Sequence, residues 1–312
     1  MTKPACSKSD SGQTLLRFFI PNVWDETLVA LLEAQGFGRA VAESTYASGA
    51  LASDTEDPNR ESEVRLLSST ESSHQVIATV QSWFEAWGLT AYQWRIDQEL
   101  HDAIEIDPEA LWRASWRPFR CAGYVIHADF HPRERLTLRP GDIPLTIFAG
   151  SAFGTGGHAS TRLALKVLTE WCETNPPTRM LDVGTGSGIL AVAAALRGVR
   201  EVVGMDPDLQ SAPQAARTAH VNGVSSQCQF WRGGYETARG TWPAVMANLV
   251  ADLLQDGARD LAQLVAPQGK LFAGGILDLH WQPTCDVFAS MGLQLEQELE
   301  RGRWRAGIWS KL

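Results

Sequence analysis

The chain has 312 residues, of which 44% are hydrophobic and 20% charged, and its formal net charge at pH 7 is −9. This length is enough for two domains, and the acidic balance disfavours broad nucleic-acid binding and suits a basic protein partner. No apolar run approaches the ~20 residues of a membrane-spanning helix, and the polar N-terminus has no apolar signal core. The dispersed cysteines contain no C-x-x-C pair, which indicates a reducing, cytoplasmic setting without a disulfide framework or a zinc site.

The first part of the chain predicts a tail and a small domain. Residues 1–13 are polar and are expected to be disordered. Residues 14–97 fit the order β-α-β-β-α-β of the ferredoxin-like arrangement. Asp25 and Ser73 are candidate helix caps, and the second helix has Val76, Val80, Phe84 and Trp87 along one face. The strands are predicted at 15–20, 40–47, 63–67 and 91–96.

Residues 98–122 are predicted to connect this domain to a second one. The segment is acidic at first and then rich in Trp and Arg, with a helix expected over 107–115. Trp112, Trp116 and Phe119 are expected to pack between the domains, and an aromatic substrate surface is the alternative.

The second domain, 123–312, is organised around MLDVGTGSGILAVAAALRGVREVVGMD at 180–206. A short apolar strand, a turn with three glycines, an alanine-rich helix and a strand ending at Asp206 follow one another, as in units that bind adenosine-containing cofactors. Asp206 comes 22 residues after Gly184, where a carboxylate can bind both ribose hydroxyls. A structural turn that binds nothing is the alternative.

The glycine spacing favours one kind of cofactor. Dinucleotide sites read G-x-G-x-x-G, whereas this turn reads G-x-G-x-G, with Ile189 in place of the third dinucleotide glycine. An acidic residue followed by G-x-G-x-G fits the S-adenosylmethionine (SAM) site of class I methyltransferases better.

The rest of the domain predicts an α/β, doubly wound, Rossmann-like sheet that ends in a β-hairpin, which is typical of class I methyltransferases. Ligands of such sheets lie beyond the carboxyl ends of the strands, where Gly184, Asp206, Gly233 and Asn248 are all expected. Strands are predicted at 123–128, 135–138, 180–183, 227–232, 244–249, 270–276, 294–300 and 303–310. Helices are predicted at 209–222, 252–265 and 284–291.

A glycine-rich loop, 152–158, precedes a helix that is expected to start near Ser160 or Thr161. It contains Phe153, Thr155 and His158, a composition that suits a lid over a ligand. An ordinary helix-capping loop is the alternative.

Several motifs together resemble the PrmA family, methyltransferases of large-subunit ribosomal protein eleven. AFGTGGHASTRLALKVL, LDVGTGSGILAVAA, GMDPD, VMANLVADLL and GGIL follow in the family's order and spacing, and WRASWRPF resembles its connector. The chain departs from the family at Gly157 and Ala159, where many members have a larger residue and a proline, and at Gly274, which replaces a frequent serine.

The resemblance implies a cofactor site and a catalytic residue. Thr161, Gly184, Asp206 and Asn248 would contact SAM, with Gly186 in the same turn. Phe153 and Thr155 would lie in a mobile loop near the cofactor. Asn248 would also orient the target amine, and no metal is expected.

The resemblance also implies a function, methylation of lysine or N-terminal amino groups of a basic ribosomal protein that docks on the N-terminal domain. A lysine methyltransferase of a flavoprotein electron carrier is the first alternative. A nicotinamide oxidoreductase and a non-catalytic SAM-binding module are further alternatives. Neither a membrane nor a sequence-specific nucleic acid is expected as a partner.

Overall fold

In this computed structural model the described residues are 13–21, 24–37, 40–44, 61–101, 117–148, 157–174 and 176–311. The chain divides into two compact units. The first comprises Met1–Ala50 and Glu56–Trp116, and the second comprises Leu51–Thr55 and Arg117–Leu312. The predicted tail up to residue 12 and the predicted connector helix, with Trp112 and Trp116, lie outside the described residues. Phe119 belongs to the second unit.

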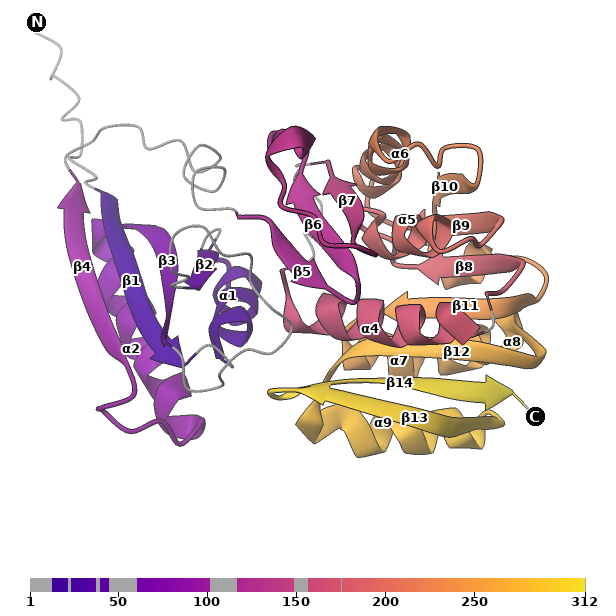
Figure 1. Cartoon of the computed structure of the whole chain (residues 1–312). Coiled ribbons are helices and arrows are strands. Elements are labelled where there is room, and N and C mark those ends of the chain that lie inside the picture. Colours follow the sequence, from indigo (N-terminus) through magenta and orange to yellow (C-terminus); the bar gives the residue numbers. More distant parts are fainter. Residues whose placement is uncertain are drawn as a thin grey trace, which may run out of the picture. The chain divides into compact units, whose positions relative to one another are not determined.

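The first unit has one antiparallel sheet, with strands in the order β2-β3-β1-β4 (Figure 1). Its elements follow the predicted order: β1 (Gln13–Pro21), α1 (Asp25–Ala34), β2 (Ala40–Ser44), β3 (Glu61–Ser69), α2 (Thr70–Ala86) and β4 (Arg95–His101). The strand predicted at 91–96 begins later, at Arg95. Thr90 and Gln93 close a turn before it, in which the Gln93 N–H donates to the Thr90 carbonyl at 2.8 Å.

Helix α2 packs its apolar face into the core of the first unit. Val76, Val80 and Phe84 are fully buried, as their spacing predicts. The predicted cap, Ser73, was wrong because it lies inside the helix. The N-cap is Ser69, whose hydroxyl accepts a hydrogen bond from the Ser72 N–H at 3.2 Å.

We expect Ser69→Ala to lower the free energy of unfolding of this unit by about 1 kcal/mol, because one N–H of the first helical turn loses its acceptor. Chemical denaturation of the full chain, followed by far-UV circular dichroism, measures this change. Ser82→Ala is the control, since this exposed serine lies in the helix interior, where alanine is neutral or slightly stabilising. Equal effects of the two substitutions would contradict the cap assignment.

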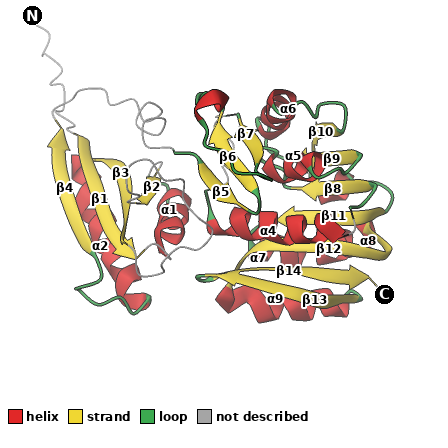
Figure 2. Cartoon of the chain, in the orientation of Figure 1, coloured by secondary structure: helices red, strands yellow, loops and turns green. Residues whose placement is uncertain are grey.

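The second unit contains two sheets (Figures 1 and 2). The small one comprises β5 (Phe119–Cys121), β6 (Tyr124–Ala128) and β7 (Ile143–Ile147). The large one has the order β10-β9-β8-β11-β12-β14-β13. Strands β8 to β12 are parallel and β14 is antiparallel to both of its neighbours. Its strands are β8 (Arg179–Val183), β9 (Glu201–Asp206), β10 (Cys228–Arg232), β11 (Trp242–Asn248), β12 (Val265–Leu277), β13 (Leu293–Arg301) and β14 (Trp304–Lys311).

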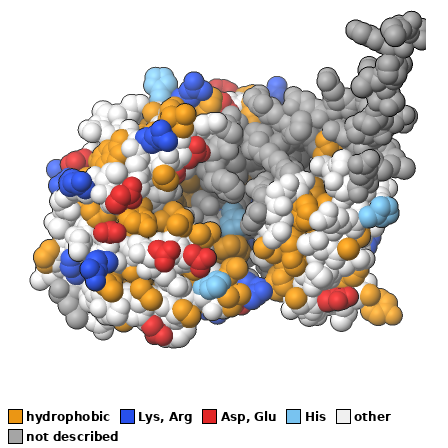
Figure 3. All heavy atoms as spheres, turned by 180° about the vertical axis from the view of Figure 1, so that it is seen from behind, with side chains coloured by type: hydrophobic (Ala, Val, Ile, Leu, Met, Phe, Trp, Pro, Cys, Tyr) orange, Lys and Arg blue, Asp and Glu red, His pale blue; other side chains and the backbone are white. Residues whose placement is uncertain are grey.

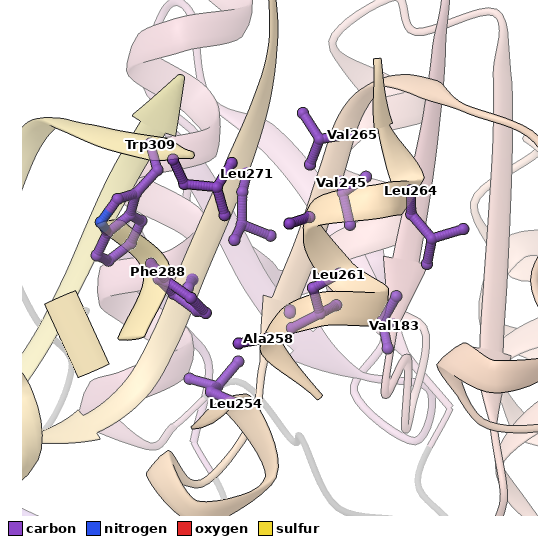
Figure 4. Packing of buried hydrophobic residues seen from close by; sticks show 14 of the residues in the cluster. Val183, Val245, Leu254, Ala258, Leu261, Leu264, Val265, Leu271, Phe288 and Trp309 are labelled. Carbon is purple, nitrogen blue, oxygen red and sulfur yellow. The ribbon is translucent and has the colours of Figure 1, made fainter. Parts of the chain in front are cut away.

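Helices cover both faces of the large sheet, which buries the inner strands β8, β9 and β11 from two sides, whereas the edge strands β10 and β13 are more exposed. On one face lie α4 (Ala159–Thr174), α5 (Ile189–Leu196) and α6 (Ser211–Val221). On the other lie α7 (Ala251–Asp256), α8 (Ala258–Leu264) and α9 (Asp278–Ser290). Figure 4 shows the core under α7, α8 and α9, in which Val183 and Val245 of the sheet lie near Leu261, and Phe288 lies beside Trp309. This arrangement leaves the carboxyl ends of β8 to β12 free to carry a site.

Three predicted elements of this unit differ from the structure. The strand at 135–138 was wrong: Arg135 ends a short 3-10 helix, η2 (Arg133–Arg135), and a loop follows. Asp142 closes this loop by accepting hydrogen bonds from Arg120 and from the Arg139 N–H. The helix predicted over 252–265 is broken at Gly257 into α7 and α8. Helix α9 begins at Asp278, earlier than the predicted start at 284. Proline is common in the first turn of a helix, but here Pro283 lies inside the helix.

Candidate functional site

The glycine turn after β8 is fixed by its backbone. The N–H groups of Gly184 and Thr185 both donate to the Met205 carbonyl, at 2.8 and 3.0 Å, which ties the turn to β9. Gly188 has φ +81°, and a Cβ there would lie 2.9 Å from the Cα of Ala215 in α6. Glycine is therefore required for the close packing of the start of α5 on α6, and no side chain among the described residues caps α5.

Asp206, at the carboxyl end of β9, lies against this turn. Its Oδ2 accepts a hydrogen bond from the Gly186 N–H at 2.9 Å, and its Oδ1 accepts one from the Asp208 N–H at 2.9 Å. The Gly233 N–H, after β10, donates to the Asp206 carbonyl at 2.9 Å. The structure thus brings together the ends of β8, β9 and β10, as the sequence predicts.

Asn248 ends β11, directly opposite Gly274 of β12. Its side-chain Oδ1 is buried and has no hydrogen-bond partner within the described part of the chain. A Cβ on Gly274 would lie 2.8 Å from that oxygen. The glycine at this departure from the family pattern therefore leaves space around an unused acceptor. Buried acceptors are costly without a partner, so this oxygen is suited to receive a donor from a ligand.

Thr161 lies in the first turn of α4 and is buried. Ala164, one turn later, lies 3.7 Å from the Cβ position on Gly274, which places the start of α4 beside the ends of β11 and β12. His158 precedes the helix, and its Nδ1 pairs with the Ser160 hydroxyl at 2.7 Å. Burial lowers the pKa of His158 to about 4, so this imidazole is neutral at pH 7. Phe153 and Thr155 lie outside the described residues.

Asp182 was noted in the sequence only as the acidic residue before the glycine turn, and it was not assigned to the site. In the structure it is fully buried, and its Oδ2 accepts a hydrogen bond from the Thr185 hydroxyl at 2.7 Å. Burial raises the pKa of Asp182 to about 7, against the smaller opposing effect of the Thr185 hydrogen bond. The sequence pattern shows an acidic residue at this position, but it does not show that the residue is buried.

We expect Asp182→Asn to change how stability depends on pH. In the unfolded chain this carboxyl has a pKa of ~3.9, so between about pH 4 and pH 7 the folded state binds more protons than the unfolded state. The Asp182 contribution to the free energy of unfolding therefore falls as pH rises through that window, by up to about 1.4 kcal/mol per pH unit. Denaturation of wild type and variant at pH 4.5, 5.5, 6.5 and 7.5 isolates this slope, and parallel curves would contradict the assignment.

The arrangement fits an adenosine-containing cofactor. Asp206, the glycine turn and Asn248 come from β9, β8 and β11, which are adjacent and parallel in the sheet. The Asp206 carboxylate, the glycine turn and the unused oxygen of Asn248 therefore lie along one edge. Among the described residues, no group of three His, Cys, Asp or Glu could hold a metal ion.

Comparison with known proteins agrees with these motifs. A sequence model of the family described as "Ribosomal protein L11 methyltransferase (PrmA)" matches residues 19–311. The ribosomal protein L11 methyltransferase of Syntrophotalea carbinolica is 46% identical over 161 residues, 51% of this chain and 52% of that protein. That of Pelotomaculum thermopropionicum is 34% identical over 207 residues, 65% of each chain. The match thus spans from about half to two thirds of the length of these curated relatives.

A solved structure supports the fold. The ribosomal protein L11 methylase of Lactobacillus delbrueckii subsp. bulgaricus superposes with a TM-score of 0.56 at 25% identity, over 61% of this chain and 95% of that one. The large sheet, its flanking helices and its terminal hairpin confirm the predicted class I methyltransferase fold. The family predicted from the sequence motifs is confirmed as well: this chain belongs to the ribosomal protein L11 methyltransferase (PrmA) family.

Proposed function

We propose that this protein is a SAM-dependent methyltransferase that methylates lysine or N-terminal amino groups of ribosomal protein L11. Family membership supports the reaction class and the substrate. The observation that carries the proposal is the unused, buried Oδ1 of Asn248, which lies at the same edge of the sheet as the glycine turn and Asp206.

The cofactor site uses residues from four segments. The Asp206 carboxylate binds the ribose hydroxyls, the turn at Gly184 and Gly186 lies against the cofactor, and Thr161 and Asn248 complete the site. SAM supplies the methyl group, on its sulfonium, for in-line displacement by the amine.

Asn248 orients the acceptor amine. A lysine has a pKa of ~10.4 and must lose a proton before its nitrogen can attack. The Asn248 Oδ1 accepts an N–H bond from the neutral amine and so directs the lone pair towards the methyl group. The proton is lost to solvent water before the attack. Positioning of this kind, which can supply ~7–11 kcal/mol in favourable cases, then carries most of the rate.

The surface is compatible with a protein partner. On the face shown in Figure 3, the described basic side chains are interspersed with acidic and hydrophobic ones. The net charge of −9 favours a basic substrate such as a ribosomal protein. No described helix is long and apolar enough to cross a bilayer. We place the reaction in the cytoplasm, where the substrate is made.

A methyl-transfer assay tests the proposal. Purified protein and methyl-labelled SAM are mixed with unmethylated ribosomal protein L11 and, separately, with undermethylated lysate, and mass spectrometry locates the label. Label on L11 amines supports the proposal. Label only on another protein, such as a flavoprotein, supports the proposed reaction but contradicts L11 as the substrate. SAM binding without any label supports a non-catalytic module.

A further inference from the structure

The candidate site, at the carboxyl ends of the parallel strands of the large sheet, has two sides. The glycine turn and Asp206 follow β8 and β9, whereas Asn248 and Gly274 lie at the ends of β11 and β12, on the other side of β8. If the proposed function holds, on which this inference rests, the cofactor lies against the β8 and β9 side and extends as far as Asn248 and Thr161. The acceptor amine must then reach Asn248 from the side of β11 and β12.

Exposed apolar side chains lie on that side. Val250, Leu253 and Leu279 are 59%, 47% and 55% exposed, and the first two directly precede the buried residues Ala251 and Leu254. Helix α7 starts after β11 and α9 starts after β12, and the two helices pack side by side. A hydrogen bond of 3.0 Å from the Gln255 amide to the Thr284 hydroxyl joins them. The three residues therefore flank the ends of two adjacent strands.

Acidic side chains accompany these apolar ones. Asp252 and Asp256 are exposed on α7, and neither forms an ion pair with any residue that the structure describes. Asp278, at the start of α9, is neutralised by Arg303 at 2.8 Å. The two aspartates of α7 thus give this side of the edge an uncompensated negative charge beside its apolar residues.

We propose that this α7–α9 surface, formed by Val250, Asp252, Leu253, Asp256 and Leu279, docks the segment of the protein substrate that flanks the target amine. The apolar side chains contact apolar residues of that segment. The aspartates attract a basic segment and favour its association, as complementary charges do. The occupant is thus a basic, partly apolar stretch around the methylated residue.

Kinetics with unmethylated ribosomal protein L11 test this surface. We expect Asp252→Lys and Val250→Ser each to raise the KM for L11 by about fivefold or more, with kcat and the Kd for SAM near wild type. Serine is a preferred N-cap, and Val250 is the N-cap of α7, so Val250→Ser leaves the helix start intact.

Two controls match these changes in chemistry. Asp286→Lys alters an exposed aspartate near the far end of α9, and Val221→Ser alters a 40% exposed valine at the far end of α6. Both controls should keep the wild-type KM. Test and control variants with the same KM would overturn the docking surface while leaving the proposed function intact. No label on L11 with the wild-type enzyme would overturn both.

Discussion

Replacing Asn248 with alanine is expected to lower kcat for methyl transfer by about 100-fold or more. Losing one preorganised polar contact to the reacting groups of an enzyme costs rate on this scale. The buried Oδ1 has no partner within the described structure, so its hydrogen-bonding capacity is free for the acceptor amine. The measurement is single-turnover methylation of L11 at saturating SAM, which separates the chemical step from binding.

The control for this prediction is another amide next to the same edge. Gln255 of α7 donates to the Thr284 hydroxyl and is not assigned to the site. Gln255→Ala should keep kcat within about twofold of wild type, because it removes one partly exposed hydrogen bond. Turnover of Asn248→Ala close to that of wild type would remove Asn248 from the catalytic role.

The fold was predictable where the sequence has strong local periodicity. The glycine turn, most of the apolar strands and the element order of the first unit follow from patterns within about 20 residues, which local physics largely determines. The small sheet of the second unit does not: β5 and β7 were not predicted, and a strand was expected at 135–138 instead. The boundaries were less predictable. Ser73 and Ser69 are chemically equivalent as caps, and in the structure α2 follows directly on β3, so that Ser69 is the cap.

The site was predictable as a set of positions but not as a set of contacts. Gly184, Asp206 and Asn248 could be placed at one edge because parallel strands end there together. The sequence could not show that Asp182 would be fully buried with a raised pKa, since that depends on helices packed over it. Nor could it show that Gly274 lies opposite Asn248, which requires the register of β11 and β12.

Replacing Asp206 with alanine is expected to weaken SAM binding by about tenfold or more. The carboxylate is held by the N–H groups of Gly186 and Asp208, at 2.9 Å each, so its orientation is fixed before any ligand binds. A ligand that donates two hydrogen bonds to a charged, preorganised carboxylate loses at least this much affinity without it. Isothermal titration calorimetry with SAM measures the change.

Asp208→Ala is the matched control for this last prediction. Asp208 is exposed, lies two residues further along, and uses its Oδ1 to accept a hydrogen bond from the Gln210 N–H at 3.1 Å. It carries the same charge as Asp206, so any general electrostatic effect on the cationic sulfonium appears in both variants. A larger loss of affinity for Asp206→Ala than for Asp208→Ala identifies direct ribose binding. Equal losses would reduce the role of Asp206 to its charge alone, and an unchanged Kd would exclude it from the cofactor site.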